Sequence, residues 1–548
     1  MLTARLGYLS GLKFLVKVNQ SKAIWAAPIL FIGALFYWPL AKLLSIGFSG
    51  NWIAPISTWR ILSIFWFTIW QALLSGLICI ALGIPGAYLF YTRRFPGQRA
   101  LKAFITVPFV LPTIVVAIGF TSFRRIPLFA PVLLENSHIP IILLANIFMN
   151  YAIAVRIIGS TWRTLDASLE DAASLDGAGR IRTFIYITFP NLMGAITSAL
   201  ALIFLYCAVS FGIVLVLGGG EINTLETEIY KSATQYLDLQ KSAGLVFLQS
   251  ILTVLAFLLS RSKIENGLVE SQIGQNRPNL DKRDLPAVAL TFTFIIILLA
   301  LPILKIFIEA FNYGGALSIK NFINLAGKGS RNILNISPTH AALNSLRNMV
   351  IASSISMGIG LIVSYLISRN FGAPMVRKFR IGLNFAFQVP IGISSVVLGF
   401  GYLITFSSGI FPLRSSWLVT PIVASLMATP LVIRLLLPVL DSIDRHLLES
   451  ASTEGASEPV IWRQIEAPII GSAILTAVGF SALISIGEFG AANFLAYGDQ
   501  ATLPIILFQL ISRPGAQNYG MAMAASSLLI LFVALVIYLI TLAESSGS

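Results

Sequence analysis

Charged residues are scarce in this chain. Asp, Glu, Lys and Arg make up only 11% of its 548 residues, whereas 56% are hydrophobic. Soluble globular proteins carry about 25% charged residues, so this composition excludes a water-soluble domain. The net charge of +14 raises the alternative of a nucleic-acid-binding protein. However, the Lys and Arg residues are spread singly over short loops, which is typical of a membrane protein whose basic loops set its orientation.

Cysteine and histidine are also rare. Cys79 and Cys207 both lie inside apolar runs, which argues against a disulfide framework and against a thiolate metal site. The three histidines, His138, His340 and His446, are scattered and form no metal-binding constellation. We therefore expect no metal site, and we interpret both cysteines as small core residues.

A cleavable signal peptide is not predicted either. The first apolar run, 24–48, follows a basic segment, is long enough to cross a hydrocarbon core, and has no A-x-A-type cleavage site after it. We interpret it as a retained membrane helix with a cytoplasmic N-terminus. Eleven further apolar runs follow, at 65–91, 103–122, 139–160, 192–217, 244–260, 287–311, 345–368, 381–405, 417–440, 469–496 and 519–542. The sequence thus predicts an all-α polytopic membrane protein with about 12 transmembrane helices and both termini in the cytoplasm.

Positive charge gathers in the loops that follow the even-numbered spans. These loops contain Arg93, Arg94, Arg99, Lys102, Arg163, Arg180, Arg182, Arg261, Lys263, Lys282, Arg283, Arg369, Arg377, Lys378, Arg380, Arg445 and Arg463. Because cytoplasmic loops carry an excess of Lys and Arg, we expect these loops to be cytoplasmic. The opposite side also carries some basic residues, namely Arg124, Arg125, Lys320 and Lys328.

A polar stretch divides the chain at 263–286. It is too short for a domain and has no apolar periodicity, so we interpret it as a cytoplasmic linker. It separates a first half, residues 1–262, from a second half, residues 287–548.

The two halves repeat one another. Several residues recur at a constant offset of 278, namely Gly177 as Gly455, Pro190 as Pro468, Arg156 as Arg434, and Phe211-Gly212 as Phe489-Gly490. Tyr88 recurs as Tyr365 at 277, and Pro108 as Pro390 at 282, which indicates small insertions. Each half has six spans, an even number. The sequence therefore predicts two parallel six-helix repeats, as in transporters whose repeats are related by an axis along the membrane normal.

The repeated segment DAASLDGAGRIRTFIYITFP (171–190) returns as ESASTEGASEPVIWRQIEAP (449–468). Each copy lies in the predicted cytoplasmic loop between the fourth and fifth spans of its half, at 163–190 and 441–468. We expect Ser168 and Asp171 to form a weak capping box at the start of a short helix, and Gly177 to supply the positive φ that ends it. A second short helix is then expected to run to Pro190. The many small residues predict a surface with little relief, which suits docking to another protein.

Both copies resemble the EAA motif, E-A-A-x3-G-x9-I-x-L-P, of ABC importer permeases. The matching positions are Asp171, Ala172, Ala173, Gly177, Ile187 and Pro190 in the first copy, and Glu449, Ser450, Ala451, Gly455, Ile465 and Pro468 in the second. Asp171, Ser450, Phe189 and Ala467 depart from the motif. The resemblance implies a MetI-like ABC permease fold in the bacterial inner membrane. It also implies that two ABC ATPase subunits dock on the two EAA loops and that a separate extracytoplasmic substrate-binding protein delivers the cargo.

Two families of permeases with fused halves compete for the resemblance. The runs SFGIVLVLGGGEINTLETEIY (210–230) and GEFGAANFLAYGDQATLPIILFQLI (487–511) look most like thiamine permeases. The sister family imports ferric iron. The resemblance therefore implies import of a small molecule or ion, with thiamine ahead of ferric iron.

A nucleotide-binding P-loop is missing. The nearest sequence is AGKGS at 326–330, where Gly329 replaces the Ser or Thr of G-x-x-x-x-G-K-[ST] and Phe322 replaces the first glycine. We therefore expect a transport subunit that is not an enzyme and has no cofactor of its own, with ATP used by partner subunits. A secondary transporter is the main alternative, but it would carry several buried carboxylates or histidines in its spans. A channel would need a pore-lining filter, and we find none.

Glu488 is an ionisable residue at predicted membrane depth, and such residues are functional candidates. One hypothesis places Glu488 and Phe489, with their repeat mates Ser210 and Phe211, on the translocation path or gate. The alternative is a helix break near Gly487 and Gly490 that satisfies the carboxylate. Glu226 and Glu228 are expected outside the membrane, either against the binding protein or on a solvated face. Arg156 and Arg434 are interpreted as structural residues near the cytoplasmic ends of their spans.

Overall fold

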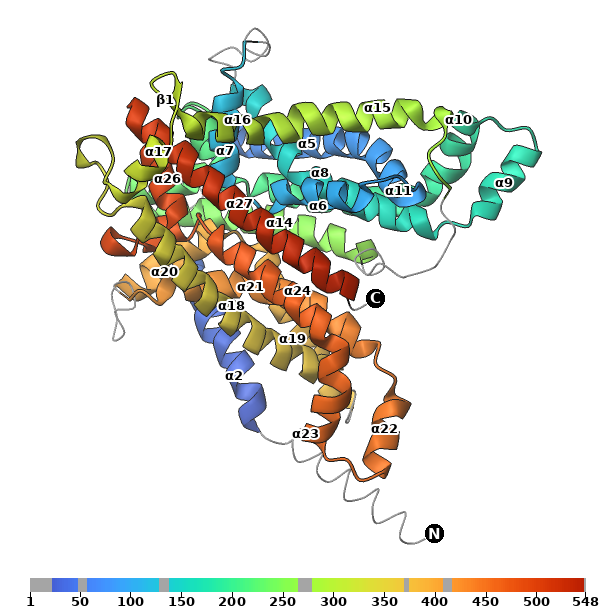
Figure 1. Ribbon diagram of the computed structural model, residues 1–548. Helices are drawn as coiled ribbons and strands as arrows, with labels where there is room; N and C mark the ends of the chain where they lie inside the picture. Colours follow the sequence, from blue (N-terminus) through green and yellow to red (C-terminus); the bar gives the residue numbers. More distant parts are fainter. Residues whose placement is uncertain are drawn as a thin grey trace. The chain divides into compact units, whose positions relative to one another are not determined.

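The computed structural model describes residues 22–47, 57–127, 138–264, 278–368, 374–407 and 416–546 (Figure 1). The basic N-terminal segment, most of the predicted linker (265–277) and Arg369 lie outside these ranges. Within them, ten helices are long and apolar enough to cross a membrane, or up to twelve if each of two bent pairs counts as one span. The predicted all-α membrane class is confirmed.

The chain divides into two compact units. Unit 1 comprises residues 1–43, 343–496 and 536–548, and unit 2 comprises 44–342 and 497–535. Three of the four boundaries fall inside α3 (Trp38–Gly47), α18 (Pro338–Ser368) and α27 (Ala516–Ser546), and the fourth, between 496 and 497, falls between helices. The predicted halves describe the sequence repeat, whereas the units describe packing, and the two divisions differ in where they place the first span of each half.

Unit 2 contains most helices of the first half. Its elements are α5 (Trp59–Thr92), α6 (Gln98–Val110), α7 (Thr113–Phe123), α8 (His138–Thr164), α9 (Ala167–Leu175), α10 (Arg180–Thr183), the π-turn η2 (Phe184–Thr188), α11 (Phe189–Ala208), α12 (Phe211–Leu217), α13 (Leu225–Thr234), α14 (Leu239–Ile264), η3 (Lys282–Asp284), α15 (Leu285–Phe294), the π-turn η4 (Ile295–Ala300), α16 (Leu301–Phe311), α17 (Lys320–Ile323), η5 (Asn324–Ala326), η6 (Ser330–Asn332), η10 (Gly498–Gln500) and α26 (Leu503–Ile511). In this unit α15 packs on α5, and α16 packs on α7. The first span of the second half therefore belongs to the unit of the first half.

Unit 1 contains most helices of the second half. Its elements are α2 (Lys22–Ile32), the π-turn η1 (Gly33–Tyr37), α19 (Pro374–Gln388), η7 (Val389–Gly392), α20 (Ser395–Ser407), α21 (Val419–Asp441), α22 (Arg445–Thr453), α23 (Glu458–Ile461), the π-turn η9 (Trp462–Glu466), α24 (Ala467–Ile486) and α25 (Ala492–Leu495). The Tyr37 hydroxyl donates to the Ala386 carbonyl at 3.0 Å, and the Tyr402 hydroxyl donates to the Leu35 carbonyl at 2.7 Å. These bonds attach the first span of the chain to helices of the second half.

Two predicted spans are sharply bent. The run 103–122 forms α6 and α7, which meet at 102°, and the run 381–405 forms α19 with η7 and then α20, which meet at 100°. Each run was predicted as one membrane span, and the bend inside it was not predicted. In the first run the cause is Pro112, because a residue before proline is pushed out of the helical region, and Leu111 is extended at ψ 141°. In the second run Pro390 lies at the start of η7, and the extended Ile393 follows it.

Two other predicted spans contain breaks. The run 192–217 is interrupted at 209–210, between α11 and α12, and the run 469–496 is interrupted at 487–491, between α24 and α25. Apolar composition alone does not reveal these breaks. They recur at equivalent places of the two halves and so belong to the repeat.

The described residues contain one two-stranded antiparallel sheet. Strands β1 (Asn312–Tyr313) and β2 (Ala316–Leu317) pair Asn312 with Leu317. Gly314 and Gly315 connect them at φ 62° and 87°. A two-residue hairpin turn of this hand needs positive φ at both positions, which glycine adopts without strain.

Candidate functional site

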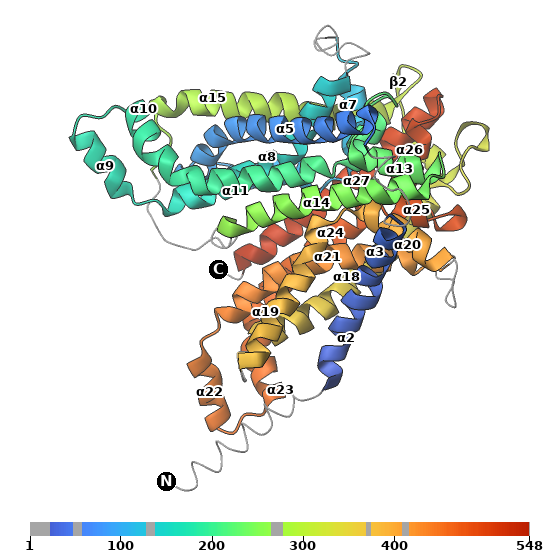
Figure 2. The same cartoon turned by 180° about the vertical axis from the view of Figure 1, so that it is seen from behind.

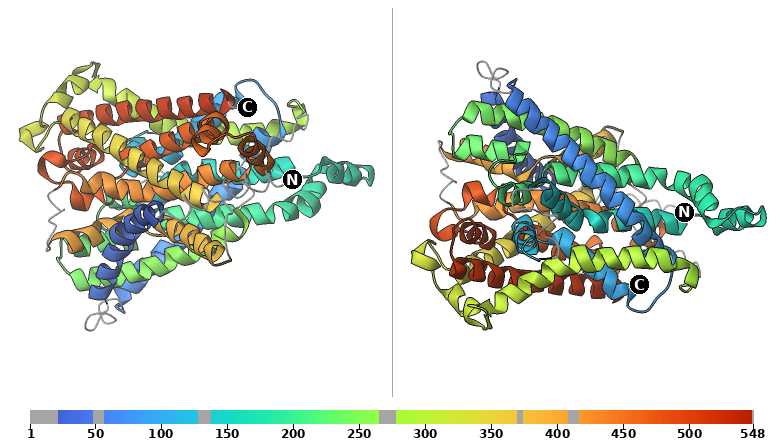
Figure 3. Two further views of the ribbon diagram at one scale, coloured as in Figure 1. Left: turned by 90° about the horizontal axis from the view of Figure 1, so that it is seen from below. Right: turned by 90° about the horizontal axis from the view of Figure 1, so that it is seen from above.

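The first EAA loop is an exposed helix–turn–helix. It consists of α9 and α10 and projects beyond the ends of the neighbouring helices of unit 2 (Figures 1 and 3). The second EAA loop consists of α22 and α23, at one end of unit 1 (Figures 1 and 2). Each loop therefore presents a short helix to the exterior of its own unit.

An aspartate caps the first helix of each loop. The Asp166 carboxylate accepts a hydrogen bond from the Ser168 amide at 2.9 Å, and Asp444 accepts from the His446 amide at 2.9 Å. The prediction that Ser168 caps α9 was wrong, since Ser168 lies inside the helix. Asp166 and Asp444 are separated by the repeat offset of 278, so the repeat itself contained the signal for the correct cap. The hydrogen bonds from Ser168 lower the pKa of Asp166 below its ordinary value.

A glycine ends the first helix of each loop, as predicted. Gly177 has φ 81° and Gly455 has φ 88°. In the first loop the Ala178 amide donates to the Ala173 carbonyl at 2.9 Å, and the Gly177 amide donates to the Ser174 carbonyl at 3.1 Å. These two bonds form a Schellman motif, which satisfies carbonyls that a helix end leaves open.

The second loop repeats this motif bond for bond. The Ala456 amide donates to the Ala451 carbonyl at 3.0 Å, and the Gly455 amide donates to the Ser452 carbonyl at 3.2 Å. The left-handed conformation strongly favours glycine, which explains why glycine stands at this position in both copies.

The second helix of each loop does not stop at the proline. It continues through a π-turn into the next span, so that 180–208 and 459–486 are continuous helices. The Phe189 amide donates to the Phe184 carbonyl, and Ala467 donates to Trp462, each across five residues. The prediction of a helix ending at Pro190 was therefore wrong. Proline lacks an amide donor and clashes with the preceding turn, and the wider π-turn just before Pro190 and Pro468 fits both constraints.

The described residues that match the EAA motif have similar exposure in the two copies, except that Ala173 is buried whereas its repeat mate Ala451 is only partly buried. Ala172, Gly177, Pro190, Glu449, Ser450, Gly455 and Pro468 are exposed, Ile187, Ala451 and Ile465 are partly buried, and Ala173 is buried. The side chain of Asp171 lies outside the described part of the structure. Docking on these residues stays a prediction, but most of them are accessible to a partner.

The two loops differ in surface chemistry. In the first loop Leu175, Ile181 and Tyr186 are 89%, 78% and 73% exposed. The repeat offset places Thr453, Pro459 and Gln464 at the equivalent positions of the second loop. The first loop therefore exposes more apolar surface.

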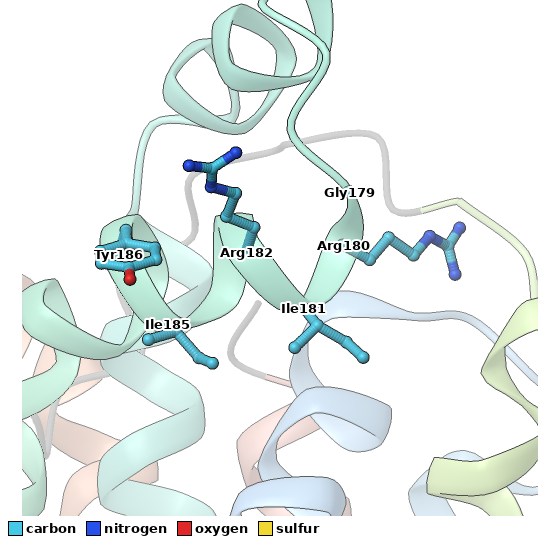
Figure 4. Close-up of a pocket in the computed structure, with 6 residues that line it drawn as sticks. All are labelled: Gly179, Arg180, Ile181, Arg182, Ile185 and Tyr186. Carbon is cyan, nitrogen blue, oxygen red and sulfur yellow. The ribbon is translucent and has the colours of Figure 1, made fainter.

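An open groove of about 570 Å³ runs along the second helix of the first loop. Gly179, Arg180, Ile181, Arg182, Ile185 and Tyr186 line it (Figure 4). Figure 4 shows that Ile181 and Ile185 point to the same side of the helix, whereas Arg182 points to the opposite side. The surface that lines the groove is therefore almost entirely apolar.

Aromatic contacts connect each loop to other helices of its own half. In the first half Trp162 at the end of α8 stacks on Phe184 at 5.8 Å and also contacts Tyr88 at 5.5 Å. In the second half Tyr365 contacts Trp462 edge-on at 6.0 Å. Sequence reasoning missed these contacts, although Tyr88 and Tyr365 had been matched as repeat mates.

The first loop also has an internal hydrogen bond of its own. The Thr188 hydroxyl donates to the Glu170 carboxylate at 2.9 Å, which links the π-turn η2 back to α9. Leu448 and Glu466 stand at the equivalent positions of the second loop. This hydrogen bond is therefore specific to the first copy.

The four predicted path residues lie at the helix breaks that follow α11 and α24. Ser210, Phe211, Glu488 and Phe489 are all buried. A Cβ atom added at Gly212 would collide with Thr113 at the start of α7, and one added at Gly490 would collide with Ser395 at the start of α20. In each half the break thus packs against the far arm of the bent helix pair.

Glu488 has a local partner at its break. The residue is 9% exposed, and its carboxylate accepts a hydrogen bond from the Ala491 amide at 2.8 Å. This bond agrees with the interpretation that a helix break satisfies the carboxylate. A role on the translocation path stays a prediction for Glu488.

The two acidic residues of α13 are buried. Glu226 and Glu228 are both fully buried, so the expectation of a solvated face was wrong. Lys241 pairs with Glu228 at 2.7 Å, and Arg60 lies at 3.7 Å. The pairing compensates the burial of this carboxylate. The described residues contain no cluster of three His, Cys, Asp or Glu side chains placed to hold a metal ion.

Comparison with known proteins finds a family whose profile matches this chain. The profile of the family described as "Binding-protein-dependent transport system inner membrane component" matches residues 79–312 and 356–545. The thiamine transport system permease protein ThiP of Brucella abortus is 27% identical, over 82% of this chain and 82% of its own length. ThiP of Escherichia coli is 26% identical over 88% and 90%. The ferric transport system permease protein FbpB of Actinobacillus pleuropneumoniae is 25% identical over 97% and 79%.

Proposed function

The chain belongs to the family of binding-protein-dependent transport system inner membrane components, and from this premise we propose that its two EAA loops dock separate ATP-hydrolysing subunits. The chain would thus be the membrane subunit of an ABC importer, placed in a bacterial inner membrane with both termini in the cytoplasm. A separate extracytoplasmic binding protein would deliver the cargo.

The matched architecture of the two loops carries this proposal. Each loop has an aspartate cap, a Schellman motif with a glycine at positive φ, and a π-turn before a proline. Two loops of the same construction in one chain suit two copies of one partner. A single docking helix would not need this duplication.

The continuous second helix suggests how docking acts on the membrane. In the first half residues 180–208 form one helix of 29 residues, about 43 Å long at 1.5 Å per residue. A partner that moves the exposed loop would move this helix as a lever, and the lever ends at the break beside Ser210 and Phe211. In the second half the helix 459–486 ends beside Glu488 and Phe489. We therefore place the gate of the translocation path at these breaks.

Thiamine is the cargo that we propose. Two of the similar proteins are named thiamine permeases, and their similarity extends over most of both chains. Ferric iron is the second candidate, because the ferric permease FbpB matches 97% of this chain at nearly the same identity. Selection of the cargo would rest mainly on the external binding protein.

A photo-crosslinking experiment tests docking. A photoreactive amino acid at Leu175, which is 89% exposed, should crosslink to the ATPase subunit when the two proteins are produced together. Leu317 in β2 is 88% exposed and is predicted to lie on the opposite side of the membrane, so it is the matched control. Equal crosslinking at both positions, or none at Leu175, would contradict docking on the first EAA loop.

The cargo is tested on the binding protein. The binding protein that copurifies with this chain should be titrated with thiamine and with ferric iron by calorimetry. Saturable binding of thiamine and weak binding of iron would support the first candidate. The reverse result would favour ferric iron and leave the docking proposal intact.

A further inference from the structure

A buried aspartate joins the end of the linker to the first half. The Asp284 side chain is 1% exposed, and the Arg93 Nε donates to its Oδ2 at 2.9 Å. The Tyr88 hydroxyl donates to Oδ1 at 2.7 Å. The Asp281 amide donates to Oδ2 at 3.0 Å in a capping box at the start of η3. Arg93 also donates to the Tyr88 hydroxyl and lies over its ring at 4.8 Å.

The first EAA loop reaches the same carboxylate. Arg180 is the first residue of α10, and its Nη1 lies 3.6 Å from the Asp284 Oδ1. We refer to Asp284, Tyr88, Arg93 and Arg180 as the Asp284 cluster. Figures 1 and 2 both show α10 beside the start of α15, where Asp284 precedes Leu285.

The Arg180 contact is the releasable part of the Asp284 cluster. The Arg180 side chain is 55% exposed, whereas that of Arg93 is only 17% exposed. If Arg180 moves away, Asp284 keeps Arg93, the Tyr88 hydroxyl and the Asp281 amide. Leaving a buried charge without a partner is strongly unfavourable, and the remaining partners of Asp284 avoid that state. The loop can therefore engage and disengage while the rest of the cluster stays in place.

A second route connects the cluster to the same loop. The Tyr88 ring contacts Trp162 at 5.5 Å, and Trp162 stacks on Phe184 in the π-turn η2 at 5.8 Å. The cluster thus contacts the start of the second helix of the loop directly, and its π-turn through Trp162.

Among the described residues, the second EAA loop shares the aromatic route with the first. Tyr365 replaces Tyr88 and contacts Trp462. The repeat offset puts Glu458 in place of Arg180, and an offset of 277 puts Asn370 in place of Arg93. The two cationic partners of Asp284 therefore have no cationic counterparts at these matched positions of the second copy.

We propose that Asp284 is a positioning residue that ties the first EAA loop, and not the second, to the linker and to α15. This inference rests on the proposed function, because it assigns the tie to a docking loop for an ATPase subunit. The two ATPase subunits would then dock on loops that differ in mobility, the first loop being held more firmly than the second. Motion of the first loop would be transmitted to α15 as well as to α11.

Hydrogen exchange on the full-length chain in detergent tests the tie without any partner. Arg180→Gln removes only the releasable contact, and we expect amide exchange in 176–190 to rise about two- to fivefold, as befits a half-exposed ion pair. Exchange in 88–98 and in 454–468 should stay unchanged. Asp284→Asn should raise exchange in both 88–98 and 176–190. Arg180→Lys keeps the charge and should restore most of the protection.

Arg283→Gln is the matched control. Arg283 is 75% exposed and adjoins Asp284 in η3, so its loss should leave all three segments as in the wild type. Unchanged exchange in 176–190 for Arg180→Gln would overturn the proposal. An equal rise in 176–190 and 454–468 would also overturn it, because the effect would then not be confined to the first loop.

A coupling assay separates this inference from the proposed function. In proteoliposomes that contain the chain, its ATPase subunits and its binding protein, Arg180→Gln should at least double the ATP hydrolysed per thiamine imported. If the wild-type complex imports nothing with ATP, the proposed function fails, whereas the exchange result still decides the tie. If the wild type imports thiamine and Arg180→Gln leaves both the exchange and the ratio unchanged, the inference alone fails.

Discussion

Replacing Gly177 by alanine should loosen the first EAA loop through its backbone alone. Gly177 has φ 81°, and no atom lies within 4 Å of an added Cβ. An L-residue other than glycine costs about 1–2 kcal/mol in this conformation. Alanine also restricts the unfolded chain, which offsets about 0.4–1 kcal/mol. The midpoints of these two ranges give a net loss of about 0.8 kcal/mol, which corresponds to roughly a fourfold change in a local equilibrium.

The amides of Gly177 and Ala178 report this loss directly, because they make the two hydrogen bonds of the Schellman motif. We expect amide hydrogen exchange at residues 177 and 178 to rise two- to fivefold in Gly177→Ala. Gly177→Asn is the matched control, since asparagine tolerates positive φ better, and its exchange should rise less. Gly455→Ala should give the same rise in the second loop. Equal exchange in the wild type, Gly177→Ala and Gly177→Asn would refute the role of the left-handed glycine.

Three further predictions concern the breaks and the cap. Gly490→Ala forces a Cβ against Ser395, and overpacking of this kind should cost about 1–3 kcal/mol and lower the melting temperature of the purified protein. Glu488→Gln keeps an oxygen for the Ala491 amide, so the melting temperature should be retained while uptake falls at least threefold, and full uptake would remove Glu488 from the path. Asp166 has a lowered pKa, so the cap bond to Ser168 should persist above the ordinary value of 3.8 and be lost as the pH falls through the lowered pKa. The protection factor of the Ser168 amide measures this loss, and Asp166→Asn should abolish its pH dependence.

The sequence predicted the membrane class, the repeat and the exposed loops because each has a strong local signal. Apolar runs of about 20 residues indicate membrane spans. Gly177 and Gly455 indicate helix ends, because a helix commonly ends at a glycine in the left-handed conformation. Composition also predicted spans at the right places. The bends within these spans were harder to predict, because a bent pair such as α6 and α7 is as apolar as a straight helix.

The errors have physical causes that local patterns do not contain. Ser168 and Asp166 are both good cap residues, and only the repeat mate Asp444 distinguishes them. Pro190 indicated a helix end, but a π-turn lets the helix pass through it. Asp284 looked like one charge in a polar linker, because its partners Arg93 and Arg180 are far away in the sequence.

ATP-driven uptake tests most directly whether this chain is the membrane subunit of an ABC importer. Proteoliposomes should contain the full chain, its ATPase subunits and its binding protein, with radiolabelled thiamine outside and ATP within. Uptake should need ATP and the binding protein, should proceed without a proton gradient, and should be lost when both EAA loops carry helix-breaking Gly177→Pro and Gly455→Pro substitutions. Uptake driven by a proton gradient in liposomes that lack the ATPase subunits would contradict this role.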